Sequence, residues 1–232
     1  MARANGDALT AIAGMFILLP GVVSGWLLPD PKRPGEGATL TDILNANSDY
    51  MAAHWPVVAV SALIVAFGSL ALLALLIHPT RPTVAVALRL GLAALPFYML
   101  ASLLQAMVVA GGFMLFILPG VYLAARFLCI GPIVVAEGRR GALATLVRSF
   151  QLTRGNGVRI ILMLAVILML ALIASTALGA VVGIASTLLP PDLARFANIL
   201  ASSLIETGLA ATVTIIGASI YRQTSAPRPL MI

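Results

Sequence analysis

Residues 160–191, IILMLAVILMLALIASTALGAVVGIASTLLPP, decide the fold class of this chain, because none of them is charged. The nearest charged residues are Arg159 on one side and Asp192 on the other. A helix needs about 20 apolar residues to cross the hydrocarbon core of a bilayer. The run is continuously apolar and does not alternate as the strands of a membrane barrel do. It therefore predicts a transmembrane helix.

Other stretches show the same pattern. Residues 8–29 and 50–80 carry no Asp, Glu, Lys or Arg, and residues 196–221 carry only Glu206. Residues 90–125 are too long for one crossing, because a helix of that length would extend ~54 Å at ~1.5 Å per residue. We expect this stretch to fold back at Gly111-Gly112, since glycine tolerates a tight turn.

The sequence thus predicts an all-α, polytopic membrane helix bundle that forms a single domain over residues 1–232. Six transmembrane helices are expected near residues 8–28, 55–77, 84–110, 112–136, 158–185 and 196–221. The first is expected to be a retained span rather than a signal peptide, because its flank holds only Arg3 against Asp7 and no A-x-A site follows.

The composition excludes the main soluble classes. Hydrophobic residues make up 61% of the chain, charged residues only 9%, and the mean hydropathy is +1.07. Soluble domains carry about 25% charged residues, so a soluble enzyme or a disordered chain is excluded. The single cysteine, Cys129, excludes a disulfide framework and a cysteine-based metal site.

Basic residues predict the orientation through the positive-inside rule. With a cytoplasmic N-terminus, the outer segments hold only Lys32, Arg33 and Arg195. The inner segments hold Arg3, Arg81, Arg89, Arg139, Arg140, Arg148, Arg154, Arg159, Arg222 and Arg228. Both termini are therefore expected in the cytoplasm. We expect anionic membrane lipids as partners, and no nucleic acid. The expected headgroup contacts are Arg139, Arg140, Arg148, Arg154 and Arg159.

The cytoplasmic connection contains an amphipathic pattern near 140–154. Leu143, Leu146, Val147 and Phe150 recur at helical spacing, and the opposite side is polar. The polar side comprises Arg140, Arg148, Ser149 and Gln151. This pattern predicts a helix in the plane of the membrane interface, ended by the glycines around Asn156.

An internal repeat is one interpretation of the two Leu-Pro-Gly-Val strings at 19–22 and 118–121. A methionine precedes each string at the same distance. Two repeat halves, 1–110 and 111–232, would each hold three helices of opposite topology, as in many transporters. Chance recurrence of a helix-kinking string in an apolar chain is the alternative.

The run FILPGVYLAARFLCIGPIVVAEGRRGALATLVRSFQLTRGNGVRIILML, residues 116–164, resembles the membrane domain attached to some bacterial glycerophosphoryl diester phosphodiesterases. It also resembles related uncharacterised bacterial integral membrane proteins that consist of this domain. The matching features are the LPG turn, the arginine after it, the Gly-Pro pair, Glu137 and the SFQLTRG string. The resemblance implies a multi-pass protein of the bacterial inner membrane. It implies no phosphodiesterase activity, because the soluble catalytic barrel of those enzymes is missing.

Catalytic patterns are lacking in the sequence. The two histidines, His54 and His78, flank one predicted span and would lie on opposite sides of the membrane. The acidic residues of the first outer loop, Asp30, Asp42 and Asp49, do not have the spacing of a calcium loop. No phosphate-binding loop, nucleophile elbow or zinc-protease string occurs. We expect neither an enzyme nor a cofactor or metal.

Arg126 and Glu206 are the notable polar residues, because an ionisable side chain at the bilayer centre costs ~2.5–3.5 kcal/mol on insertion scales. We hypothesise an intramembrane polar site in which they face the bundle interior and pair, or share a pocket, with Gln105 and Tyr122. A packing ion pair, or an Arg126 that extends to the headgroups, is one interpretation. A site for a ligand, a lipid or a proton is the other.

Two function classes follow. The first is a non-enzymatic inner-membrane protein that interacts with lipids or supports partner proteins in envelope homeostasis. The second is a small transporter or lipid flippase that uses Arg126 and Glu206. A water-accessible cavity that reaches Glu206 would favour the second class.

Overall fold

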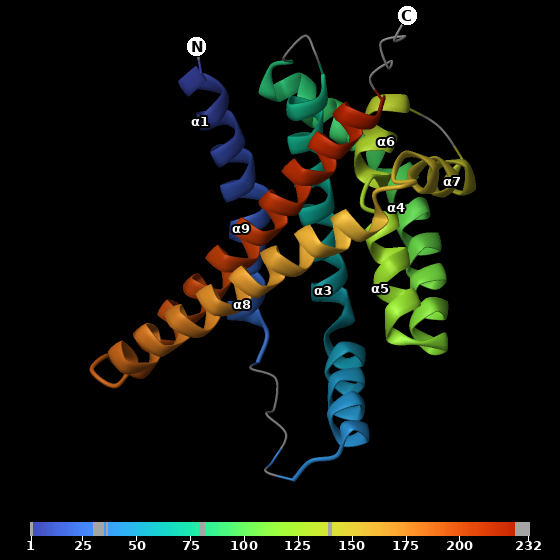
Figure 1. Ribbon diagram of the computed structural model, residues 1–232. Coiled ribbons are helices and arrows are strands. Elements are labelled where there is room, and N and C mark those ends of the chain that lie inside the picture. Colours follow the sequence, from blue (N-terminus) through green and yellow to red (C-terminus); the bar gives the residue numbers. More distant parts are fainter. Residues whose placement is uncertain (1, 30–34, 36, 79–81, 139–140, 226–232) are drawn as a thin grey trace, which may run out of the picture.

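A computed structural model describes residues 2–29, 35, 37–78, 82–138 and 141–225, and every element in them is helical (Figure 1). The elements, in chain order, are α1 (Ala2–Ala13), the π-helix η1 (Gly14–Leu18), α2 (Leu19–Leu27), α3 (Leu40–Ile77), α4 (Val84–Leu115), α5 (Ile117–Arg126), α6 (Ile130–Glu137), α7 (Ala142–Leu152), α8 (Gly157–Ser186) and α9 (Pro191–Ser225). The all-α prediction is confirmed.

Six segments of the described chain are long and apolar enough to cross a membrane, as predicted. They are Gly6–Leu27, Thr41–Ile77, Val84–Leu115, Ile117–Glu137, Gly157–Ala185 and Pro191–Ser225. α1 begins and α9 ends at the same end of the molecule, as an even number of crossings requires (Figure 1). The chain is therefore a polytopic membrane helix bundle.

α3 is longer than a bilayer requires. Its 38 residues extend ~57 Å, because the helix also includes the second half of the connection between the first two spans. Thr39 and Asp42 form a capping box at its start: the Asp42 amide donates to Thr39 Oγ1 at 3.2 Å, and the Thr39 amide donates to Asp42 Oδ2 at 2.9 Å. This cap fixes where the long helix begins.

The prediction that the chain folds back at Gly111-Gly112 is wrong. Both glycines lie inside α4, and the chain reverses at Phe116, which has extended backbone angles (φ −163°, ψ 159°). Gly112 instead allows close packing of α4 and α5, because a Cβ there would lie 3.0 Å from the Gly120 Cα atom. Glycine at this position serves a helix–helix contact and not a turn.

The buried core lies among α3, α4 and α6, whose Leu70, Ala101 and Ile130 are almost fully buried. α2 packs against α9 through Gly21-x-x-x-Gly25, where a Cβ on Gly25 would lie 2.8 Å from Ile199. These glycines therefore serve packing inside one chain.

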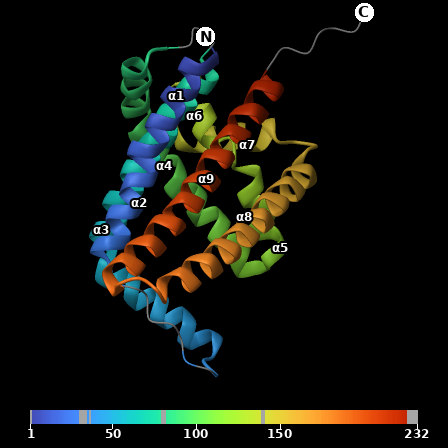
Figure 2. The same ribbon diagram turned by 90° about the vertical axis from the view of Figure 1, so that its left-hand side faces the viewer.

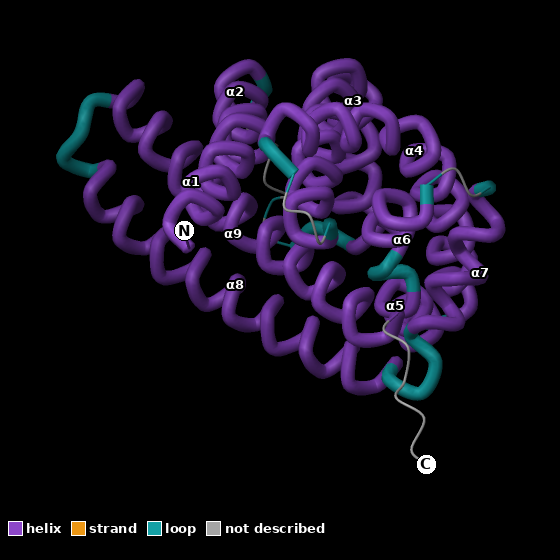
Figure 3. Tube along the Cα trace, turned by 90° about the horizontal axis from the view of Figure 1, so that it is seen from above, coloured by secondary structure: helices purple, strands orange, loops and turns teal. Residues whose placement is uncertain are grey.

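α8 and α9 form a hairpin that runs at a slant to the other helices (Figures 1 and 2), and α9 packs along α2 and α3. Seen from above, α8 runs along one edge of the bundle (Figure 3). It packs against α9 and α5 and leaves large apolar side chains exposed, among them Leu162, Met169 and Leu172. In a bilayer this face is suited to contact with lipid tails.

Candidate functional site

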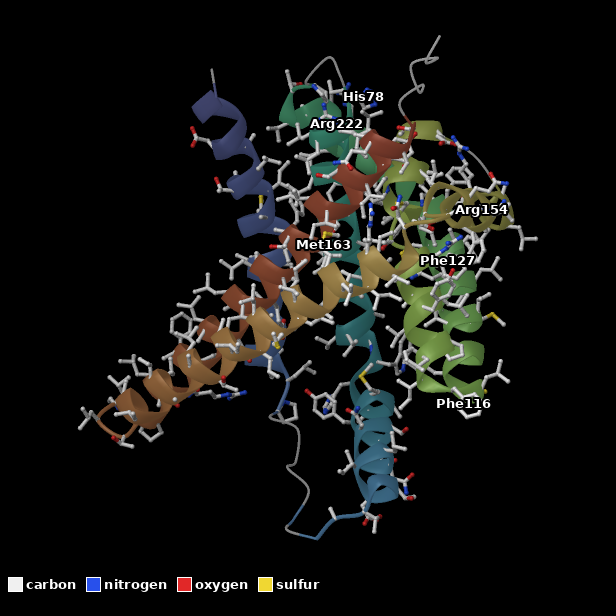
Figure 4. All side chains as sticks on the ribbon, viewed as in Figure 1. His78, Phe116, Phe127, Arg154, Met163 and Arg222 are labelled. Atoms are coloured by element: carbon white, nitrogen blue, oxygen red, sulfur yellow. The ribbon has the colours of Figure 1, made fainter. Side chains whose placement is uncertain are left out.

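The fourth span is broken in its interior. α5 ends at Arg126, residues 127–129 form a turn, and α6 begins at Ile130. Pro132 has no N–H, so the Leu128 carbonyl lacks the i+4 partner that an unbroken helix would supply. Phe127, at the turn, lies between Phe116 at the lower end of α5 and the upper end of the bundle (Figure 4). Helix-end peptide groups inside a span must find partners within the protein.

The Arg126 side chain donates hydrogen bonds to carbonyl groups at the end of α7. Its Nη1 donates to the Thr153 carbonyl at 3.2 Å, and its Nη2 donates to the Phe150 carbonyl. Its guanidinium carbon lies 3.8 Å from the centroid of the Phe150 ring, and the residue is only 3% exposed. The carboxyl end of a helix carries a partial negative charge that favours a cation. Arg126 is thus buried and held by α7.

α7 in turn caps the end of α5. Ser149 Oγ donates to the Arg126 carbonyl at 2.9 Å, and Thr153 Oγ1, which is 2.8 Å from the Ser149 carbonyl, lies 3.2 Å from the same Arg126 oxygen. Both hydroxyl residues are fully buried. The two helix ends therefore satisfy each other's carbonyl groups across more than 20 residues of sequence.

This arrangement corrects the prediction for the 140–154 helix at one residue, Ser149. The helix exists as α7: its buried side holds Thr145, Leu146 and Ser149, and Leu143 and Val147 are 70% and 55% exposed. Ser149 was expected on the polar, outward side. It points inward because the carbonyl at the broken span needs a donor.

The four residues of the predicted intramembrane site fall into two pairs. Tyr122 Oη lies 3.3 Å from Arg126 Nη1, so these two meet as expected. Gln105 and Glu206 line a separate cavity. Within the described chain Arg126 makes no ion pair with Glu206, and the pairing hypothesis is corrected on this point. Carbonyl groups of α7, not a carboxylate, face the arginine.

The cavity with Glu206 has a volume of about 420 Å³ and lies between α3, α4, α6, α9 and the turn after α5. Its polar lining residues are Ser69, Tyr98, Gln105, Glu206 and Thr214. The other lining residues are apolar and include Phe127 and Pro132. The broken span therefore borders both the Arg126 contacts and this cavity.

A further polar contact joins three helices near the upper end of the bundle. Glu137 Oε1, at the end of α6, accepts from Arg148 Nε of α7 at 3.2 Å and from Tyr221 Oη of α9 at 3.2 Å. This role of Glu137 was not predicted from the sequence. Its position could have predicted an ion pair, because a carboxylate at the carboxyl end of a helix is repelled by the helix dipole and is stabilised by a cationic partner.

Beside this contact lies a polar hollow of about 770 Å³. Its lining residues are Arg148, Gln151, Leu152, Arg154, Asn156, Gln223 and Thr224. Arg154 is exposed beside α7 (Figure 4). Of the other predicted headgroup contacts, Arg159 is exposed outside the hollow, and Arg139 and Arg140 lie outside the described residues.

Within the residues that the structure describes, no three His, Cys, Asp or Glu side chains are grouped to hold a metal ion. His54 packs edge-on against Tyr50, and Cys129 is buried. In comparisons with known proteins, the chain matches no family model, no curated protein and no solved structure.

Proposed function

We propose that this chain is a non-enzymatic protein of the bacterial inner membrane that binds the headgroup of an anionic lipid at the polar hollow between α7 and α9. The observation that carries the proposal is the convergence of Arg148 and Arg154 with amide and hydroxyl side chains in a space of about 770 Å³. Arginine and neutral hydrogen-bond donors are the groups that recognise phosphate oxygens.

The helix beside the hollow supports a lipid over a free anion. The exposed face of α7 carries Leu143, Val147 and Phe150, which are suited to insertion among acyl chains. A lipid would thus meet cationic groups at its phosphate and apolar groups along its tails. Cytoplasmic termini belong to this proposal, since the positive-inside rule places these arginines on the cytoplasmic side.

Membership of the phosphodiesterase membrane-domain family is part of the same proposal, and the residues that carry this resemblance lie beside the hollow. The residues that carry the resemblance, 116–164, form α5, α6, α7 and the start of α8. They therefore include the Arg126 contacts and one side of the hollow. In this proposal the shared sequence serves lipid binding and membrane organisation.

Native mass spectrometry of protein from nanodiscs with equal phosphatidylglycerol and phosphatidylcholine tests the proposal. Wild type is expected to retain phosphatidylglycerol selectively, and Arg154→Gln to lose most of that selectivity. Arg159→Gln is the matched control, because Arg159 is exposed but does not line the hollow. Equal retention of both lipids by wild type, or equal losses in the two variants, would overturn the proposal.

A small transporter or lipid flippase is the second candidate. The cavity that contains Gln105 and Glu206 favours it, because binding sites of transporters lie near the midplane beside interrupted helices. The predicted inverted repeat belongs with this candidate and stays a prediction.

A further inference from the structure

Glu206 lies in the middle of the last span. It is about 22 Å along the helix axis from Pro191 and about 28 Å from Ser225 at 1.5 Å per residue. The other acidic residues of the described helices lie within the first ten residues of a helix or at its last residue; these are Asp7, Asp42, Asp49, Glu137 and Asp192. A carboxyl group at this depth calls for an explanation, since intramembrane ionisable residues mark functional sites.

The charge of Glu206 has no partner within the described chain. No cationic side chain is among the residues that line its cavity, and Arg126 is occupied by the end of α7. Gln105 is the other strongly polar group in the lining. An ionised carboxylate facing an apolar space is costly unless a cation pairs with it, and the neutral acid is the alternative form.

The size and walls of the cavity identify the kind of cation. A volume of about 420 Å³ lies within the range of small-molecule pockets and far exceeds the needs of a bare metal ion. Leu70, Leu73 and Leu209 supply apolar wall, and Tyr98 and Phe127 supply aromatic rings. Aromatic faces attract organic cations, and one carboxylate balances one positive charge.

The cavity is also accessible from the side of the bundle. Glu206 is itself exposed on the surface of α9, although it lines the cavity. A ligand dissolved in the lipid phase can therefore reach the carboxylate from the side. This route suits a molecule that is both cationic and apolar.

We propose that the cavity between α3, α4, α6 and α9 binds a lipophilic organic monocation, with Glu206 as its counter-charge and Tyr98 and Phe127 as its aromatic walls. The inference names a ligand class for the transporter candidate. It is independent of the lipid-headgroup proposal, because the headgroup hollow and this cavity have no lining residue in common.

Equilibrium dialysis of the detergent-purified full chain against radiolabelled tetraphenylphosphonium tests the proposal. Wild type is expected to bind saturably, and tetraphenylborate, an anion of matched shape, is not expected to compete. Glu206→Gln should weaken binding at least about tenfold, which corresponds to ~1.4 kcal/mol. Asp192→Asn is the matched control, since it removes an acid from the same helix outside the cavity.

A second variant keeps the carboxylate and removes the space. Leu209→Trp places a larger ring in the cavity and is expected to weaken tetraphenylphosphonium binding, so the test does not depend on folding of Glu206→Gln. Non-saturable uptake by wild type would overturn the proposal, as would competition by tetraphenylborate. Unchanged binding in a folded Glu206→Gln or Leu209→Trp protein would overturn it too. Any of these results leaves phosphatidylglycerol selectivity at the headgroup hollow unaffected.

Discussion

Replacement of Arg126 by alanine tests the proposed role of the contacts at the broken span. The change removes two hydrogen bonds from a charged donor, to the carbonyl groups of Phe150 and Thr153, each worth ~1.5–3 kcal/mol. It also removes a cation–π contact worth ~0.5–2 kcal/mol. The sum is an upper limit, because the buried Nε atom has no partner and its desolvation cost disappears with the side chain. We expect a loss of ~3–5 kcal/mol in the free energy of unfolding.

Unfolding by SDS titration in mixed micelles, followed by far-UV circular dichroism, measures this loss. Arg126→Lys should recover only part of it, because one ammonium group does not reproduce the planar fork and the stacking of a guanidinium. Arg159→Ala is the control: the residue is exposed, and its replacement should change the free energy by less than ~0.5 kcal/mol. A loss below ~1 kcal/mol for Arg126→Ala, or full stability of Arg126→Lys, would refute the reasoning.

Three further substitutions test other contacts. Gly120→Val should destabilise the α4–α5 hairpin by ~1–3 kcal/mol in the same titration, because a Cβ there would lie 2.4 Å from Phe113 Cγ; unchanged stability would show that the two helices separate easily. Tyr221→Phe removes the 3.2 Å hydrogen bond to Glu137 and should lower the free energy of unfolding by ~1 kcal/mol. An unchanged free energy would show that this hydrogen bond does not stabilise the fold. Thr39→Ala should lower the hydrogen-exchange protection of the first turn of α3 by an equivalent of ~1 kcal/mol and leave the other spans unchanged.

The contacts of α7 show where sequence patterns mislead. Helical periodicity predicted the helix but placed Ser149 on its outer side, because periodicity sorts residues by polarity and assumes that polar means exposed. In the structure the Ser149 hydroxyl bonds to a carbonyl 23 residues away in the chain. The assumption fails for a buried hydroxyl group with a hydrogen-bond partner, because the hydrogen bond offsets the cost of removing the group from water.

The turn between α4 and α5 shows a second limit. The glycine pair was a reasonable prediction for the reversal, since glycine tolerates turn conformations. It also allows two helices to approach closely, and the structure uses Gly112 in this way. A glycine pair in a turn and a glycine pair in a close helix contact look the same in the sequence. Only the segment that packs against the pair distinguishes them.

The sequence by itself determined the all-helical class and the six spans, because transfer of a contiguous apolar segment into lipid depends on composition and length, which are local properties. Only the tertiary structure decided the partner of Arg126 and the separation of Glu206 from it. Those outcomes depend on which distant carbonyl, hydroxyl or carboxylate groups the packed helices bring within hydrogen-bond reach. Hydropathy carries no information on that geometry.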